Sequence, residues 1–218
     1  RYNNNINAEQ FRKQMEEENI LFPTRKSWWY IPRSHLDFYS KKGQLGAGHY
    51  VAENPEYGAV FTYYLKEDIK TLKEIRQEKE KKLDEKNRDI PFPGWEELEI
   101  EKQQDKIKVW ISIEDSQGNT VRRVFAPTKK GFHRVAWDFR YPSPYAIKVD
   151  TESKGNLPPE PSSGLLAPPG TYSATLFRQI DGKISKLAGP DNFDVVQLRQ
   201  GALKGAQLSD LAAFWRKY

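Results

Sequence analysis

The chain of 218 residues is long enough for one large domain with extensions, and 37% of its residues are hydrophobic. Its 35 basic and 30 acidic residues are mixed along the sequence, so the net charge of +5 provides no clustered positive face for nucleic acid. The absence of Cys excludes disulfides and thiolate sites, and no apolar run reaches the roughly 18 residues of a membrane span.

Residues 1–50 are predicted to form an N-terminal extension with one short helix and an irregular linker. The capping-box pattern of Asn7–Gln10 and the apolar residues behind it at helical spacing predict a helix that ends near Asn19. The run Trp28–Tyr30 that follows is strongly apolar, but Pro32 stops regular structure behind it. We therefore expect an irregular linker in this part of the chain.

Residues 51–197 carry the alternating patterns of a β domain. The clearest strand is Ile107–Ile113, where Ile and Val on one face alternate with Lys, Trp and Ser on the other. Asp181-Gly182 is a strong turn signal between two later strands. The other predicted strands are Val60–Leu65, Thr120–Phe125, Phe132–Phe139, Gly170–Phe177, Ile184–Leu187 and Phe193–Val196. About seven short strands separated by turn residues predict a β-sandwich.

A helical hairpin, residues 66–105, is predicted as an insertion after the first strand of this domain. A narrow, mostly apolar stripe at spacings of three or four is formed by Ile69, Leu72, Ile75, Lys79 and Leu83. The prolines of Pro91–Pro93 separate it from a second short helix at Trp95. Residues 66–89 hold nine basic and eight acidic side chains, so their charges largely cancel. We expect one end of the hairpin to lie against the sandwich and the other to project into water.

Residues 198–218 are predicted to form a C-terminal helical extension. Its apolar residues at helical spacing are Leu208, Leu211, Ala212 and Trp215. The pattern is still running at Tyr218, and the chain begins at Arg1 without Met. We therefore expect the chain to be part of a larger protein.

Four segments carry a resemblance to a known family: Gly58–Lys66, Ile113–Arg122, Gly131–Arg140 and Ala167–Tyr172. They are similar to the region that follows the propeller in bacterial proteins with sortilin-like or BNR (Asp-box) repeats, which are often labelled glycosyl hydrolases. The combination also resembles an immunoglobulin-like sandwich of the flagellar hook-capping type. The resemblance runs from about Tyr50 to Val196.

This resemblance implies a non-catalytic accessory domain of a secreted or periplasmic protein, since the chain contains no Ser-x-Asp-x-Gly-x-x-Trp Asp-box and no blade repeat. The implied partner is the propeller upstream in the same parent chain. Any glycosidase activity would belong to that missing region. An independent glycoside hydrolase is a weaker alternative, and we expect no cofactor.

The segment with His133, Trp137, Asp138 and Arg140 is the most tempting catalytic constellation, because a His and an Asp can act as base and orienting group. On a strand, however, His133 and Asp138 point to opposite faces. Trp137 shares the face of His133 and suits the core, while Asp138 and Arg140 share the other face and can pair. We therefore interpret these four residues as a structural motif.

Two interpretations remain open for the aromatic residues Trp28, Trp29 and Tyr30. Large apolar patches mark partner contacts, so the three residues fit a seam with the missing propeller. Flat aromatic rings also stack on sugars, which makes a carbohydrate-binding module the alternative function. Tyr145, in the proline-rich loop from Pro142 to Pro169, offers a further aromatic surface.

Other chemical groups give weaker signals. Glu96, Glu97, Glu99 and Glu101 could act as paired carboxylates, but no apolar surroundings raise a pKa there, and a solvated face is the better interpretation. The chain has three histidines, without the spacing of metal ligands, so we predict no metal site.

Overall fold

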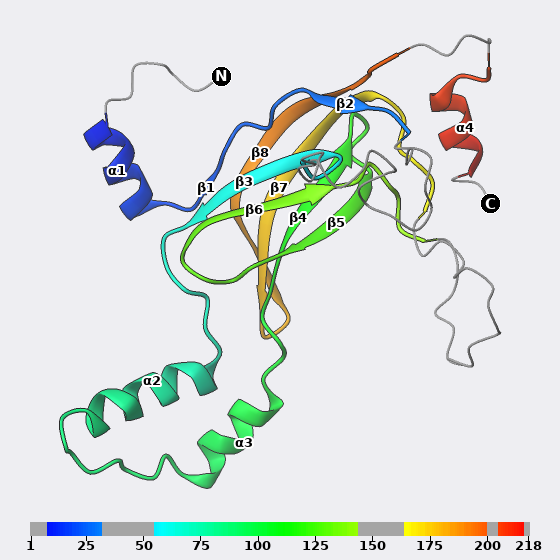
Figure 1. Ribbon diagram of the computed structural model, residues 1–218. Coiled ribbons are helices and arrows are strands. Elements are labelled where there is room, and N and C mark those ends of the chain that lie inside the picture. The colour runs from blue at the N-terminus through cyan, green and yellow to red at the C-terminus, as the bar shows by residue number, and fades with distance from the viewer. Residues whose placement is uncertain (1–7, 32–54, 144–163, 200–204, 216–218) are drawn as a thin grey trace, which may run out of the picture.

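The computed structural model describes residues 8–31, 55–143, 164–199 and 205–215, and the protein is mainly β (Figure 1). The strands are β1 (Ile20–Leu21), β2 (Ser27–Trp29), β3 (Ala59–Leu65), β4 (Lys108–Asp115), β5 (Thr120–Ala126), β6 (Gly131–Trp137), β7 (Gly170–Ile180) and β8 (Lys183–Gln197). The helices are α1 (Ala8–Glu17), α2 (Leu72–Asp84), α3 (Trp95–Gln103) and α4 (Leu208–Trp215).

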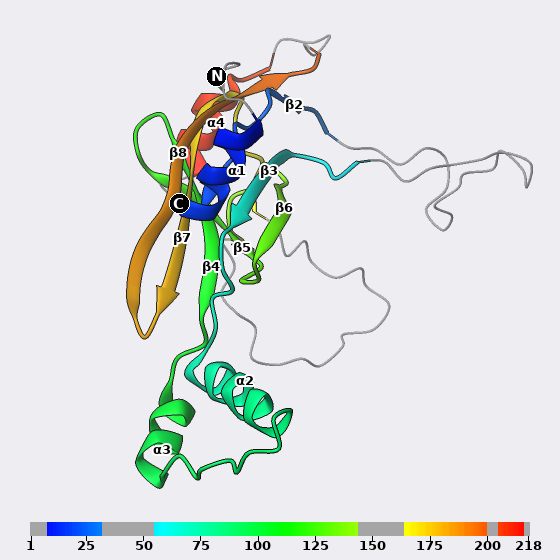
Figure 2. The ribbon, with the colours of Figure 1, turned by 90° about the vertical axis from the view of Figure 1, so that its left-hand side faces the viewer.

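The strands form two sheets that pack face to face, as the two views show (Figures 1 and 2). One sheet has the order β1-β3-β6 and the other the order β2-β8-β7-β4-β5. The pairings are antiparallel except that β2 runs parallel to β8. The N-terminal segment therefore contributes a strand to each sheet.

Aromatic side chains fill the space between the sheets. The rings of Phe61 and Phe193, from opposite sheets, lie 5.3 Å apart, and Trp137 lies 5.2 Å from Tyr172. The predicted inward residues Val109, Ile111 and Ile113 of β4 are buried, but Ser112 on the other face is buried too, so burial does not alternate along this strand. Trp110, on the other face of β4, is buried as well, because it stacks on Phe177 of the neighbouring strand.

The prediction of an irregular linker is wrong for the residues that form β1 and β2. These strands of two and three residues are too short to show a period. They exist because Ile20 and Leu21 pair with β3 and because β2 pairs with β8, more than 160 residues away in the chain. The predicted helix before them is confirmed as α1.

Two other strand predictions need correction. The two predicted strands Ile184–Leu187 and Phe193–Val196 are parts of one strand, β8, which stays paired with β7 across register shifts near Leu176. The strand predicted to reach Phe139 ends as β6 at Trp137. Phe139 has a φ of 59° and is fully buried.

The helical hairpin of α2 and α3 lies between β3 and β4 in the chain and projects away from the sheets (Figures 1 and 2). Its first helix starts at Leu72, later than Lys66, because Thr71 and Glu74 form a capping box there. The backbone N–H of Ile69 donates to the carbonyl of Thr128 (2.9 Å), which fixes the base of the hairpin to the sandwich. In the described parts of the chain, no helix is sufficiently long and apolar to span a bilayer.

The buried hydroxyl of Tyr63 makes stability sensitive to alkali. It donates to the carbonyl of Pro127 (2.9 Å), and burial raises its pKa above the usual value. Above pH 10 or so the unfolded chain loses this proton while the folded chain keeps it, so the free energy of unfolding falls, by up to about 1.4 kcal/mol per pH unit. In urea titrations from pH 8 to pH 11, Tyr63→Phe should lose stability less steeply than the parent protein. Equal slopes for the two proteins would contradict this assignment.

Candidate functional site

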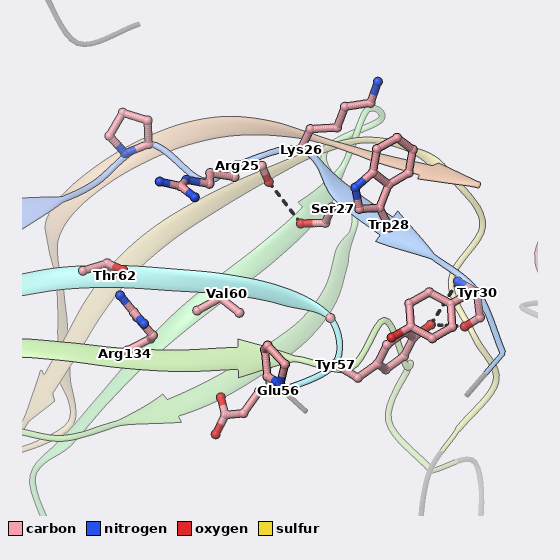
Figure 3. A pocket seen from close by; sticks show the side chains of 13 residues that line it. Arg25, Lys26, Ser27, Trp28, Tyr30, Glu56, Tyr57, Val60, Thr62 and Arg134 are labelled. Carbon is pink, nitrogen blue, oxygen red and sulfur yellow. Dashed lines mark hydrogen bonds between the residues drawn. The ribbon is translucent and has the colours of Figure 1, made fainter. Parts of the chain in front are cut away.

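A surface cavity with polar and aromatic walls lies between β2 and β3, and we call it the β2–β3 groove (Figure 3). Its volume is about 640 Å³. Its lining residues are Pro23, Arg25, Lys26, Ser27, Trp28, Tyr30, Pro55, Glu56, Tyr57, Gly58, Val60, Thr62 and Arg134. The groove is therefore lined by residues of β2, β3, β6 and the segments that precede β2 and β3.

The groove exists because the N-terminal segment leaves one sheet for the other. The backbone N–H of Phe22 still donates to the carbonyl of Thr62 on β3 (2.9 Å). Thr24 is the next residue whose N–H would face β3, because antiparallel bonding to one neighbour uses every second residue. The N–H of Thr24 donates instead to Oδ2 of Asp191 on β8 (2.7 Å), and β2 then pairs with β8. The chain thus opens a gap between β2 and the first half of β3.

Positive charge dominates the walls of the groove. Arg25 and Lys26 come from the segment before β2, and Arg134 comes from β6, where it lies opposite Thr62 of β3. Glu56 is the carboxylate among the lining residues. Within the described ranges, none of the three cations forms a salt bridge with a carboxylate. The groove therefore favours a ligand with negative charge.

Aromatic rings form one end of the groove. Tyr57 lies between Tyr30 and Phe139, with ring centroids 4.8 Å and 5.3 Å away. The hydroxyl of Tyr57 donates to the carbonyl of Tyr30, and burial is the main reason why the pKa of Tyr57 is raised. This tyrosine therefore stays protonated at neutral pH and holds the end of β2 against the start of β3.

The predicted aromatic set Trp28, Trp29 and Tyr30 is divided between the surface and the core. Trp29 is buried, and its Nε1 donates to the carbonyl of Ala167 (2.9 Å). Trp28 and Tyr30 are 49% and 42% exposed, because successive side chains on a strand point to opposite faces. Tyr145 lies outside the described residues.

In the His133 segment, both His133 and Trp137 contact a backbone carbonyl and neighbouring aromatic rings. Nε2 of His133 lies 2.6 Å from the carbonyl of Lys129, and its ring packs on Tyr63. Trp137 is 1% exposed, and its Nε1 donates to the carbonyl of Arg140 (3.0 Å).

The predicted pairing of Asp138 with Arg140 takes place through the backbone. The N–H of Arg140 donates to Oδ1 of Asp138 (3.1 Å), while the guanidinium of Arg140 donates to the carbonyl of Gly164 (2.9 Å). Both contacts stabilise the turn after β6 and the chain segment beside it.

The acidic side chains that the structure describes do not converge on a metal site. In the part of the chain that the structure describes, no group of three His, Asp or Glu residues could hold a metal ion. Glu101 is one of the glutamates considered as a catalytic acid. Its carboxylate accepts hydrogen bonds from Nε and Nη2 of Arg76 (2.7 Å and 3.0 Å). The expectation of a solvated acidic face does not hold for Glu101, because its carboxylate is paired with Arg76 and only 10% exposed.

Comparison of the chain with family models, with curated proteins and with solved structures finds no match. The β2–β3 groove and the helical hairpin must therefore be interpreted from their own geometry.

Proposed function

We propose that this chain is a non-catalytic interaction domain of a larger secreted or periplasmic protein, and that its helical hairpin binds a neighbouring domain of that protein. The resemblance to the region behind BNR propellers makes the upstream propeller the partner of this proposal. The sandwich acts as a scaffold, and the hairpin acts as the binding arm.

An immunoglobulin-like scaffold is part of the proposal. The N-terminal segment pairs first with β3 and then with β8, so one piece of chain supplies one edge strand to each sheet. Tyr172, near the start of β7, donates its hydroxyl to the carbonyl of Pro168, four residues upstream. A tyrosine in this position with a bond to the upstream backbone is a recurrent feature of immunoglobulin-like sandwiches.

The observation that carries the functional proposal is the exposed apolar surface of the hairpin. Neither α2 nor α3 contains a buried residue. Trp95 is 80% exposed and contacts Phe92, whose ring centroid lies 5.3 Å away. The other exposed apolar side chains of this region are Leu72, Ile75, Ile90 and Ile100. Large exposed apolar side chains concentrated in one short region mark contacts with partners, because their burial releases ordered water.

The two helices are held in a fixed arrangement despite their small contact with the sandwich. The guanidinium of Arg76 binds Glu101 through two hydrogen bonds and Glu80 through a third (2.6 Å). The backbone N–H of Leu72 donates to Oε1 of Gln104, which follows α3 (2.8 Å). The apolar surface is therefore presented to a partner with little loss of conformational entropy on binding.

Replacing Trp95 with alanine tests this function. With the parent propeller expressed as a separate chain, we expect Trp95→Ala to weaken its association with this domain by at least about tenfold, because large exposed aromatics are frequent hot spots. Calorimetric titration measures the change. Phe125→Ala is the matched control, since Phe125 is a 67% exposed aromatic residue on β5. An unchanged affinity in Trp95→Ala, or an equal loss in both variants, would refute the role of the hairpin.

The alternative function, carbohydrate binding, depends on Trp28 and Tyr30. The Nζ of Lys26 lies 5.2 Å from the ring centroid of Trp28, and the ring of Tyr30 packs against Tyr57. One side of each of these two aromatic rings is thus already in contact with the protein. We therefore keep glycan binding as an outcome to be tested at the β2–β3 groove.

A further inference from the structure

We propose that the β2–β3 groove is a second binding site, which takes an extended peptide segment with acidic side chains as an added strand on β3. This site is separate from the helical hairpin and does not depend on the function proposed for it. Figure 3 shows the side chains that line the groove, among them Arg25, Lys26 and Arg134.

The edge of β3 offers backbone N–H and C=O groups for strand pairing beyond the point where β1 turns away from it. Phe22 and Thr62 are opposite each other. In an antiparallel sheet, every second residue of a strand bonds to the same neighbour, so Val60 directs its N–H and C=O to the same side as Thr62. A continued β1 would place Thr24 opposite Val60. The N–H of Thr24 is instead bonded to Asp191, and Val60 lines the groove. Pairing with such an edge is an established mode of peptide recognition.

The edge of β2 faces the same gap. The carbonyl of Trp29 accepts from the N–H of Leu198 (2.9 Å), so the backbone of Trp29 is directed to β8. The backbone groups of Trp28 are then directed away from β8, because neighbouring residues on a strand alternate. An added segment would therefore lie between two strand edges, one from each sheet.

Charge complementarity selects the side chains of the peptide. Three cations, Arg25, Lys26 and Arg134, line the groove together with the carboxylate of Glu56. Arg25 and Arg134 approach from the β2 side and the β6 side (Figure 3). A strand with an acidic residue at every second position would direct its carboxylates to one face, within reach of Arg25 or Arg134 at the sides of the groove.

The backbone edges favour a peptide over a sugar chain as the occupant. A glycan would use the ring faces of Trp28 and Tyr30, which Lys26 and Tyr57 already contact on one side. A glycan would also leave the N–H and C=O of Val60 without the regular pairing that a strand provides.

The test uses the full chain and two pools of ten-residue peptides. In one pool Asp or Glu alternates with Val, Ile or Thr, and in the other Lys replaces the acids. We expect the acidic pool alone to bind, and we expect Arg134→Glu to weaken this binding by about tenfold or more. Val60→Pro, which removes the free N–H, should weaken it similarly. Lys82→Glu, the same charge reversal on the exposed face of α2, should have no effect.

Several results would overturn the proposal. These are no binding of the acidic pool, equal binding of both pools, or acidic-pool binding that neither Arg134→Glu nor Val60→Pro weakens. Binding of oligogalacturonate without binding of the acidic pool would assign the groove to an anionic glycan instead. Thermal unfolding of each variant establishes that it is folded. Trp95→Ala should leave peptide binding unchanged, so that failure at the groove and failure at the hairpin remain distinguishable.

Discussion

Replacing Trp137 with alanine is expected to lower the free energy of unfolding by about 3–5 kcal/mol, the usual cost of truncating a fully buried tryptophan. Its indole contacts Phe139 and Tyr172, with ring centroids 5.4 Å and 5.2 Å away, and reaches Phe193 of the other sheet. The substitution would leave a cavity where the two sheets meet. Urea unfolding followed by circular dichroism measures the loss.

His133→Ala is the control for this prediction, because the two residues share one face of β6. His133 lies at the edge of the core and contacts Tyr63 and the carbonyl of Lys129. We expect its loss to cost less than about 1.5 kcal/mol, the range of one hydrogen bond. If His133→Ala lost much stability while Trp137→Ala lost little, Trp137 would not be the main core residue of this strand, which would contradict the prediction.

Gly58→Ala is expected to destabilise the protein by about 3 kcal/mol or more, because two penalties combine at this position. Gly58 has a φ of +122°, a conformation that side chains disfavour. A Cβ at this position would lie 1.8 Å from the carbonyl oxygen of Trp137, a backbone atom that cannot rotate away. The substitution must therefore push β3 and β6 apart at the entrance to the β2–β3 groove.

Gly118→Ala separates the two penalties. Gly118 also has a positive φ, of +80°, but no atom lies within 4 Å of the added Cβ. We expect a loss of about 1 kcal/mol, from the backbone conformation alone. Comparable losses in the two variants, measured by chemical unfolding, would show that the contact between Gly58 and Trp137 is unimportant.

The main strands and the helical hairpin could be predicted because their signals are local. The sequence pattern from Ile107 to Ile113, which predicts β4, alternates over seven residues. The turn between β7 and β8 is indicated by the adjacent residues Asp181 and Gly182. In contrast, β1 and β2 depend on partners far away in the chain. Their residues show an apolar character but no repeated period, so their sheets could not be assigned.

The candidate site was only partly predictable for the same reason. Trp28 and Tyr30 were identifiable as unusual aromatic residues, but no sequence signal distinguishes the exposed pair from the buried Trp29 until β2 is known to be a strand. Arg134 enters the site through the register of β6 with β3, and Tyr57 enters through its contact with Tyr30. Both contacts join segments that are remote in the sequence.

The hairpin and the groove suggest different forms of recognition by one scaffold. The hairpin offers an apolar surface with Trp95 at its most exposed point, whereas the groove offers strand edges and positive charge. The first suits a folded domain, and the second suits an extended segment. Variants in one region should therefore leave binding at the other unchanged.

We propose that α2 and α3 form the contact with a neighbouring domain. Amide hydrogen exchange in these helices, compared between the isolated chain and its complex with the parent propeller, tests it most directly. We predict that the amides of both helices exchange more slowly in the complex. Unchanged exchange in α2 and α3, with protection confined to the sheets, would contradict the claim.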